Sequence, residues 1–154
     1  MAKPYAVPDT VLKGVKLFYS LSEAELSFLA ERIVRRRVNA DDWVFSEGDR
    51  CEGLYVIESG SIRILEASAG GRELALSVEG PGSSLGELPL LDGGTYPAAA
   101  QAIVDSELLL VRTEDLRALC LRHPEVGVKI LSSVASQLRP ILGVVEQLCF
   151  STVR

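Results

Sequence analysis

Between Asn39 and Val111, apolar residues alternate with polar ones, and turn-forming residues recur about every ten positions. Alternation with period two is typical of strands, whereas a helix repeats every 3.6 residues. The turn positions hold Gly, Pro, Asp and Ser, which supply positive φ angles or preset turns. Many short strands joined in this way predict an antiparallel barrel or roll.

The predicted strands are marked by short apolar runs between these turns. The last run, at 107–111, contains four consecutive aliphatic residues and predicts a strand that is buried on both faces. The earlier runs are marked by Trp43 and Phe45, by Tyr55 and Ile57, by Ile62 and Ile64, and by Leu74, Leu76 and Val78.

A helix is predicted before the strands. Ser22 and Glu25 have the spacing of a capping box, and Leu21 with Leu26 has that of a hydrophobic staple. We expect this helix to run from about Ser22 to Val34. The three arginines at 35–37 would then lie at its C-terminal end, where positive charge suits the helix dipole and solvent.

Two helices are predicted after the strands. Thr113 is the expected cap of a short helix, which Pro124 ends because proline disfavours helical geometry in the residue before it. The second helix runs from about Pro124 to Cys149, and Pro140 predicts a kink in it. Apolar residues there are spaced alternately three and four apart, which is the a/d pattern of paired helices. These residues are Leu131, Val134, Leu138, Ile141, Val145 and Leu148.

This apolar seam predicts a homodimer through the C-terminal helix, and packing against its own roll is the alternative.

The composition limits which other classes of partner we expect. The 154 residues carry a formal net charge of −5, which argues against a dedicated nucleic-acid binder. No apolar stretch approaches the ~20 residues that cross a bilayer, and the N-terminus lacks the apolar run of a signal peptide. We therefore expect a cytoplasmic protein with no membrane partner.

The cysteine and histidine content disfavours metal chemistry. Cys51, Cys120 and Cys149 are an odd number without CxxC spacing, so neither a disulfide framework nor a zinc site is indicated. His123 is the sole histidine, whereas metal centres in small β-barrel enzymes are His-rich. We expect no enzyme, no metal and no cofactor.

Three motifs follow one another in this chain: VFSEGD at 44–49, LYVIESGSIRI at 54–64 and GSSLGELPLL at 82–91. Together they resemble the cyclic nucleotide-binding domain of bacterial regulators of the catabolite-activator type, from about Leu17 to the end. The resemblance implies an α+β fold, mainly β: an eight-stranded antiparallel β-roll of the double-stranded β-helix (jelly-roll) type, with an N-terminal helix and a long C-terminal helix. We expect a lead-in at 1–16 and the domain at 17–154, with the roll at about 38–112 and C-terminal helices at about 113–150.

The resemblance also implies a phosphate-binding cassette for a ligand such as cAMP or cGMP. Gly86 and Glu87 match its glycine and its glutamate, which accepts hydrogen bonds from the ribose hydroxyl while backbone N–H groups hold the phosphate. The alternative is that Gly86 only allows a tight turn and that Glu87 caps a helical turn at 88–91.

The cassette departs from the family where an arginine pairs with the phosphate. Tyr96 lies at that position, or Pro97 if the alignment shifts by one residue. Tyr96 could donate its hydroxyl to a ligand or fill the pocket with its ring. The segment 73–111 has a formal charge of −6 and no Lys or Arg, so we expect weak or altered cyclic nucleotide binding. The sequence does not orient Arg63 and Arg72, on the neighbouring strands.

A second departure lies on the last helix, where the family's base-contacting Thr-Ser pair falls on Ile141 and Leu142. Apolar residues there favour an apolar ligand or a helix that packs on the pocket. The predicted ligand-binding residues are Gly86, Glu87, Leu88, Tyr96, Pro97, Ala98, Ile141 and Leu142.

The chain stops at Arg154, where the family's regulators continue into a helix-turn-helix domain, so we expect no direct DNA binding by this chain. The sequence predicts a regulatory sensor domain that couples occupancy of the roll to the dimerisation helix. The alternative is a degenerate, non-binding domain that acts as a dimerisation or protein-interaction module. A β-barrel enzyme is a third hypothesis, which the single histidine disfavours.

Overall fold

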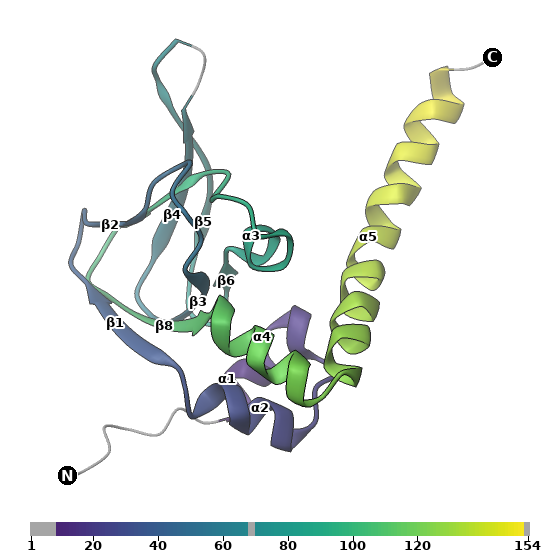
Figure 1. Ribbon diagram of the computed structural model, residues 1–154. Coiled ribbons are helices and arrows are strands. Elements are labelled where there is room, and N and C mark those ends of the chain that lie inside the picture. Colours follow the sequence, from purple (N-terminus) through teal and green to yellow (C-terminus); the bar gives the residue numbers. More distant parts are fainter. Residues whose placement is uncertain (1–8, 68–69, 153–154) are drawn as a thin grey trace.

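The computed structural model describes residues 9–67 and 70–152, and within them eight strands form a β-roll of two antiparallel four-stranded sheets (Figure 1). One sheet has the order β1-β8-β3-β6 and the other β2-β7-β4-β5. The predicted eight-stranded roll is thus confirmed. The strands are β1 (Val34–Val38), β2 (Trp43–Phe45), β3 (Gly53–Ser59), β4 (Ile62–Ala67), β5 (Glu73–Glu79), β6 (Ser84–Leu85), β7 (Ala99–Ala102) and β8 (Ser106–Arg112).

Most of the helices gather at one end of the roll, and the long α5 rises from them with its C-terminal end free (Figure 1). The short α3 lies on the side of the roll that faces α5. The helical elements are α1 (Asp9–Lys13), the 3-10 turn η1 (Lys16–Phe18), α2 (Glu23–Ala30), α3 (Glu87–Asp92), α4 (Thr113–Arg122) and α5 (Glu125–Thr152).

Strands β3 and β8 are buried on both faces, as the sequence predicts for 107–111. In β3, Leu54 and Val56 pack against the helices, whereas Tyr55 and Ile57 point into the roll. In β8, Leu109 packs on the helix side and Leu108 on the roll side. These two central strands therefore join two hydrophobic cores into one body.

The predicted capping box of α2 is present. Glu25 N–H donates to Ser22 Oγ at 3.2 Å, and Ser22 N–H donates to Glu25 Oε1 at 2.8 Å. Leu21 and Leu26 are both buried in the helix-side core, as the staple requires. Leu12, from the expected lead-in, is buried in the same core, so the described part of that segment belongs to the folded body.

The prediction that this helix runs to Val34, with the three arginines at its end, is wrong. Helix α2 ends at Ala30, and the three arginines lie in β1, at an edge of the first sheet. There Arg35 pairs with Glu58 at 2.6 Å, and Arg36 donates to the Tyr55 hydroxyl at 2.7 Å. Pairing with β8 and these charged contacts outweigh the local helical preference, and charged side chains are typical of edge strands.

The apolar residues of β5 point outward. Leu74, Leu76 and Val78 are 57%, 50% and 63% exposed. The register with β4 shifts opposite Ile64 and Leu65, and beyond the shift Glu79 pairs with the buried Ile62. Partners across a ladder share a face, so Glu79 faces the roll interior.

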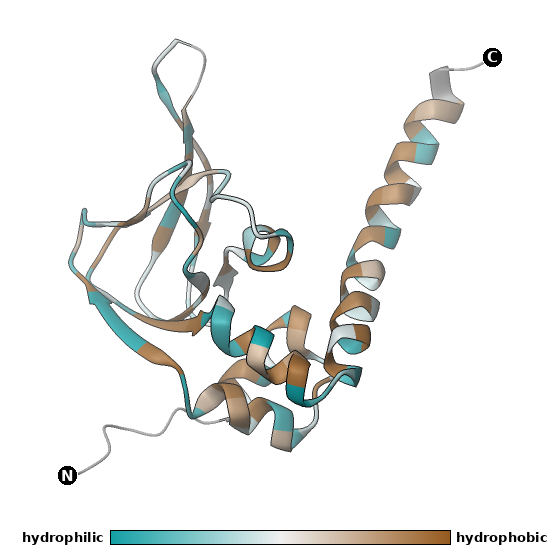
Figure 2. Ribbon diagram, in the orientation of Figure 1, coloured by the Kyte–Doolittle hydropathy of each residue, from teal (hydrophilic) through white to brown (hydrophobic). Residues whose placement is uncertain are grey.

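The C-terminal helices start and end close to their predicted positions. Thr113 is the first residue of α4 rather than its cap, and the cap residue Arg112 bonds instead to Asp115 at 2.9 Å. Helix α5 continues through Pro140 to Thr152. Every residue from 135 to 150 is exposed, and Figure 2 shows hydrophobic residues recurring along this half of the helix.

In the part of the chain that the structure describes, the segment Glu125–Phe150 of α5 is also long and apolar enough, by length and composition, to cross a membrane. The expectation that no stretch approaches that length is therefore not upheld. One such helix is weak evidence of a span, because helices that bury an apolar face against protein pass the same test.

A buried ion pair fixes the base of α5. Glu25 is 3% exposed, and Lys129 Nζ donates to its Oε1 at 2.7 Å. Burial raises the pKa of Glu25, but hydrogen bonds from Lys129 and Ser22 outweigh it and hold the pKa below the ordinary value of 4.5. The pair therefore ties α2 to α5 in the charged state.

Replacing Lys129 by Met should destabilise the domain by about 1–2 kcal/mol at pH 7, because the Glu25 carboxylate stays buried without its cation. A folded-state pKa below the unfolded one stabilises above the unfolded value, and this contribution is lost as the pH falls through the folded pKa. Urea unfolding at pH 7 and pH 3.5 should thus show a smaller difference between variant and parent at the lower pH.

The control is Lys129→Arg, which keeps the charge and should retain most of the parent's stability. Equal free energies of unfolding for the parent and Lys129→Met at pH 7 would contradict a stabilising pair.

Candidate functional site

The candidate site is a cavity of about 230 Å³ in the open side of the roll, between α3 and the approach to β7. Its wall is largely apolar. It is lined by Phe45, Ile64, Glu79, Ser84, Leu85, Gly86, Glu87, Leu88, Pro89, Tyr96, Pro97 and Ala98. The cavity thus contains six of the eight residues that the sequence predicts for ligand binding.

Gly86 has φ of +96°, a left-handed conformation that favours glycine. A Cβ there would lie 3.0 Å from Cε1 of Tyr96 and 3.1 Å from the Gly53 carbonyl oxygen. Gly86 is the cap residue of α3, and Glu87 is its first residue. The Glu87 carboxylate accepts a hydrogen bond from the Ser84 hydroxyl.

Tyr96 is part of the roll's core. It is 2% exposed, and its ring stacks on Phe45 with centroids 3.8 Å apart and an interplanar angle of 6°. Its hydroxyl donates to the Gly53 carbonyl at 2.9 Å. Burial and the neighbouring Cys51 raise the pKa of Tyr96 well above its ordinary value of 10. Tyr96 therefore contributes an aromatic wall, and its hydroxyl is engaged by the backbone.

The two arginines that the sequence leaves unoriented do not line the cavity. Arg63 lies opposite Gln101 in the β4–β7 ladder and donates to its side-chain oxygen at 2.8 and 3.0 Å. The buried Ala100 and Ala102 flank Gln101 and point inward, so Arg63 lies on the outer face. Among the described residues, the cavity wall contains two carboxylates and no cationic side chain.

Ile141 and Leu142 are not brought to this cavity. Both are exposed on α5, and Ile141 lines a separate groove with Lys16 and Tyr19. Their role as ligand contacts stays a prediction.

Glu79, which is not among the residues predicted from the sequence, lines the cavity from β5. Apolar alternation over Leu74, Leu76 and Val78 predicts that these residues face inward and Glu79 outward. In the structure the three are exposed and Glu79 pairs with the buried Ile62, an orientation that no local pattern in the sequence signals. The apolar alternation at Trp43 and Phe45 predicts a strand with an inward face. It does not predict that Phe45 stacks on Tyr96.

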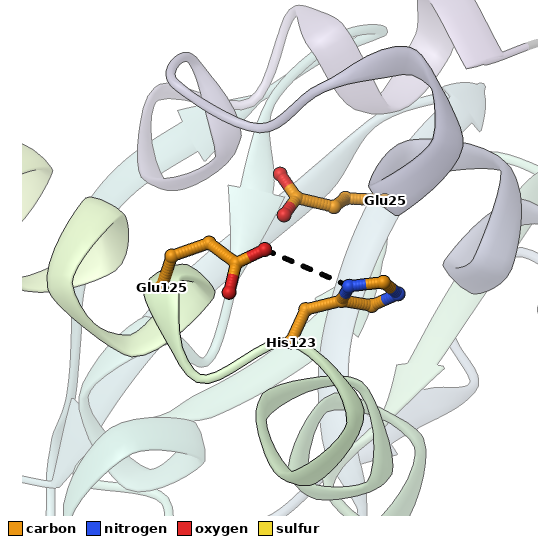
Figure 3. Close-up of side chains that lie close together, drawn as sticks. All are labelled: Glu25, His123 and Glu125. Atoms are coloured by element: carbon orange, nitrogen blue, oxygen red, sulfur yellow. Dashed lines mark ion pairs between the residues drawn. The ribbon is translucent and has the colours of Figure 1, made fainter.

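A separate cluster contains Glu25, His123 and Glu125, whose ligand atoms lie within 4.8 Å of one another (Figure 3). His123 Nδ1 is 3.6 Å from Glu125 Oε1. Glu25 already accepts hydrogen bonds from the Lys129 ammonium and from Ser22 N–H. Because the Lys129 ammonium lies where a metal ion would be attracted, we interpret this cluster as the surroundings of the Glu25–Lys129 ion pair, at the junction between α4 and α5.

The family model of the cyclic nucleotide-binding domain matches residues 35–123. The chain belongs to this family. The matched residues extend from β1 to the end of α4 and include the whole cavity wall.

Two relatives define the type of cyclic nucleotide-binding domain. The cyclic AMP receptor protein of Thermus thermophilus is 34% identical over 143 residues, which are 93% of this chain and 66% of that protein. The N-terminal domain of a transcriptional regulator from Streptomyces coelicolor A3(2) has a TM-score of 0.79 at 32% identity and covers 88% of this chain and 94% of that chain. The chain is a cyclic nucleotide-binding regulatory domain of this bacterial type.

A third relative is an enzyme, a lysophospholipase from Phaeosphaeria nodorum that is 28% identical over 106 residues. The match covers 69% of this chain and 7% of the enzyme. It therefore rests on a small part of that enzyme. The chain likewise spans just under two thirds of the Thermus receptor protein's length.

The hydrogen bond and the ring stacking of Tyr96 predict how two substitutions at this position change the stability of the domain. Tyr96→Phe should cost about 1 kcal/mol, because it removes one buried hydrogen bond to Gly53. Tyr96→Arg should cost at least about 3 kcal/mol, because it removes the stack and places a charge in the core. Denaturant unfolding measures both.

The matched control is Tyr19→Arg, at a tyrosine that is 59% exposed, and it should change the stability by less than about 0.5 kcal/mol. If Tyr96→Arg were as stable as the parent, the Tyr96 side chain would have to lie outside the core.

Proposed function

We propose that this domain is a sensor whose roll cavity binds cyclic nucleotides weakly or in an altered pose, and whose α5 forms a homodimer. The observation that carries the proposal is the charge of the cavity wall. Glu79 and Glu87 line it without a cationic side chain, and neither Tyr96 nor Pro97, the two residues that the resemblance offers for the family's arginine, is a cation.

The absence of the family's arginine determines how much weaker we expect cyclic nucleotide binding to be. A hydrogen bond to a charged group contributes roughly 1.5–3 kcal/mol. That corresponds to a loss of roughly tenfold to over a hundredfold in affinity for a cyclic phosphate. The carboxylates of Glu79 and Glu87 add repulsion toward an anionic ligand.

The dimer proposal rests on the exposed seam of α5. Leu131, Leu138, Ile141, Val145 and Leu148 lie at a/d positions and are 47% to 67% exposed. Val134 packs partly against the helix-side core. Apolar residues at a/d positions are buried when two helices pair, which stabilises the pair by the hydrophobic effect. A paired α5 also accounts for its apolar composition without a membrane, so we place the protein in the cytoplasm.

We expect a bound ligand to act on α5 through α3, because the two helices line one cavity. Leu90 and Leu91 of α3 line an apolar cavity of about 510 Å³ together with Leu131 and Val134 of α5. A ligand that shifts α3 would change the packing of the α5 base across this cavity. Occupancy can shift the helix only by its difference in affinity for the two arrangements.

The alternative function is a non-binding dimerisation or protein-interaction module. The stack of Tyr96 on Phe45 supports it, because these rings fill part of the roll interior. The two hypotheses differ in whether any small molecule enters the cavity.

Calorimetric titration with cAMP and cGMP tests the charge argument. The parent should bind either nucleotide more weakly than micromolar, and Pro97→Arg should bind at least tenfold more tightly, because it adds a cation at an exposed position on the cavity wall. The control Pro97→Gln adds length without charge and should leave the affinity unchanged.

Micromolar or tighter binding by the parent would contradict the proposed weak binding and exclude the non-binding module. No binding by the parent and no gain in a folded Pro97→Arg would favour the module.

Replacing Leu138 by Glu should convert a dimeric parent to monomer, because it places carboxylates at facing seam positions. Sedimentation equilibrium or light scattering gives the mass. Ser136→Glu, on an exposed position outside the a/d seam, is the control and should remain dimeric. A monomeric parent at high micromolar concentration would refute the seam.

A further inference from the structure

The cavity wall presents two acidic side chains that come from different elements. Glu79 ends β5 and points inward because its ladder partner, Ile62, is buried in the roll. Glu87 begins α3, and its carboxylate accepts a hydrogen bond from Ser84. Both residues line the same cavity, although eight positions separate them in the sequence.

Neither carboxylate has an ion-pair partner in the part of the chain that the structure describes. Arg63, on the neighbouring strand, is held on the outer face by Gln101. Two carboxylates in a concave site with low-dielectric walls produce a concentrated negative electrostatic potential. A ligand that complements this site therefore carries a positive charge.

The rest of the wall suits a compact apolar body. Phe45, Ile64, Leu85, Leu88 and Tyr96 contribute aromatic and aliphatic surface. The Tyr96 hydroxyl is committed to Gly53, so this ring offers the cavity no free donor for an anion. At roughly 30 Å³ per water, 230 Å³ is the space of about eight waters, which is room for a ligand of roughly ten non-hydrogen atoms.

We propose that the cavity takes a small organic cation, an amine with an aromatic or aliphatic body, whose ammonium group pairs with Glu79 and Glu87. This inference rests on the proposed sensor function, because it treats the cavity as the domain's ligand site. The proposed ligand is positively charged, whereas a cyclic nucleotide is negatively charged. Its N–H groups would donate charge-assisted hydrogen bonds to the two carboxylates of the protein.

Three probes of nearly equal size and different charge test the proposal: benzylamine, benzyl alcohol and benzoate. Titration of the intact chain, followed by calorimetry or protein NMR, should give the tightest binding for benzylamine and at least tenfold weaker binding for benzoate. Glu79→Gln and Glu87→Gln should each weaken benzylamine about tenfold and leave benzyl alcohol within twofold.

Glu73→Gln is the matched control, because Glu73 lies on the same strand but is exposed and does not line the cavity. It should leave the benzylamine affinity unchanged. Chemical-shift changes at Ala98 and Leu85 would place the probe in the cavity.

Equal or tighter binding of benzoate, no binding of benzylamine at millimolar concentration, or benzylamine binding that neither Gln variant weakens would each overturn the cation proposal. These outcomes leave the proposed function to its own tests, since the cyclic nucleotide titration and the mass of the dimer do not depend on the benzyl probes. Tight cyclic nucleotide binding would instead contradict the proposed function.

Discussion

The stack of Tyr96 on Phe45 is the interaction on which the shape of the site depends. The rings lie 3.8 Å apart inside the roll, and the Tyr96 hydroxyl ties the end of the α3 loop to Gly53 at the start of β3. Gly86 lacks a side chain at the point where a Cβ would press on the Tyr96 ring. The stack thus fixes the position of the chain on both sides of α3, and with it one wall of the cavity.

The chemistry of the cavity follows from this constraint. With the Tyr96 ring buried in the core, the charged side chains on the described cavity wall are Glu79 and Glu87. The fold of a cyclic nucleotide-binding domain is kept, while the described cavity wall carries two carboxylates and no cationic side chain. Membership of the family that this chain shares with the Thermus receptor protein does not by itself determine the ligand.

Features encoded by local periodicity could be predicted from the sequence. The aliphatic run of β8, the capping box at Ser22 and the helical period of α5 each depend on neighbours in the chain, and the structure contains the strand, the capping box and the helix. Features that depend on residues far apart in the sequence could not be predicted in this way. The arginines of β1 take their strand conformation from pairing with β8, and Glu79 points inward because it pairs with the buried Ile62 of β4. The motif placed Tyr96 at the site, but its orientation depends on Phe45 and Gly53.

The most direct test of this account is the ionisation of Tyr96, because a phenol in the core that donates to a carbonyl resists losing its proton. The phenolate absorbance near 295 nm is measured from pH 8 to 11 for the parent and for Tyr96→Phe. The account predicts that the two titrations coincide, because Tyr96 stays protonated throughout this range. A difference equal to one tyrosine that titrates near pH 10 would show that the Tyr96 hydroxyl is open to solvent, and would contradict the account.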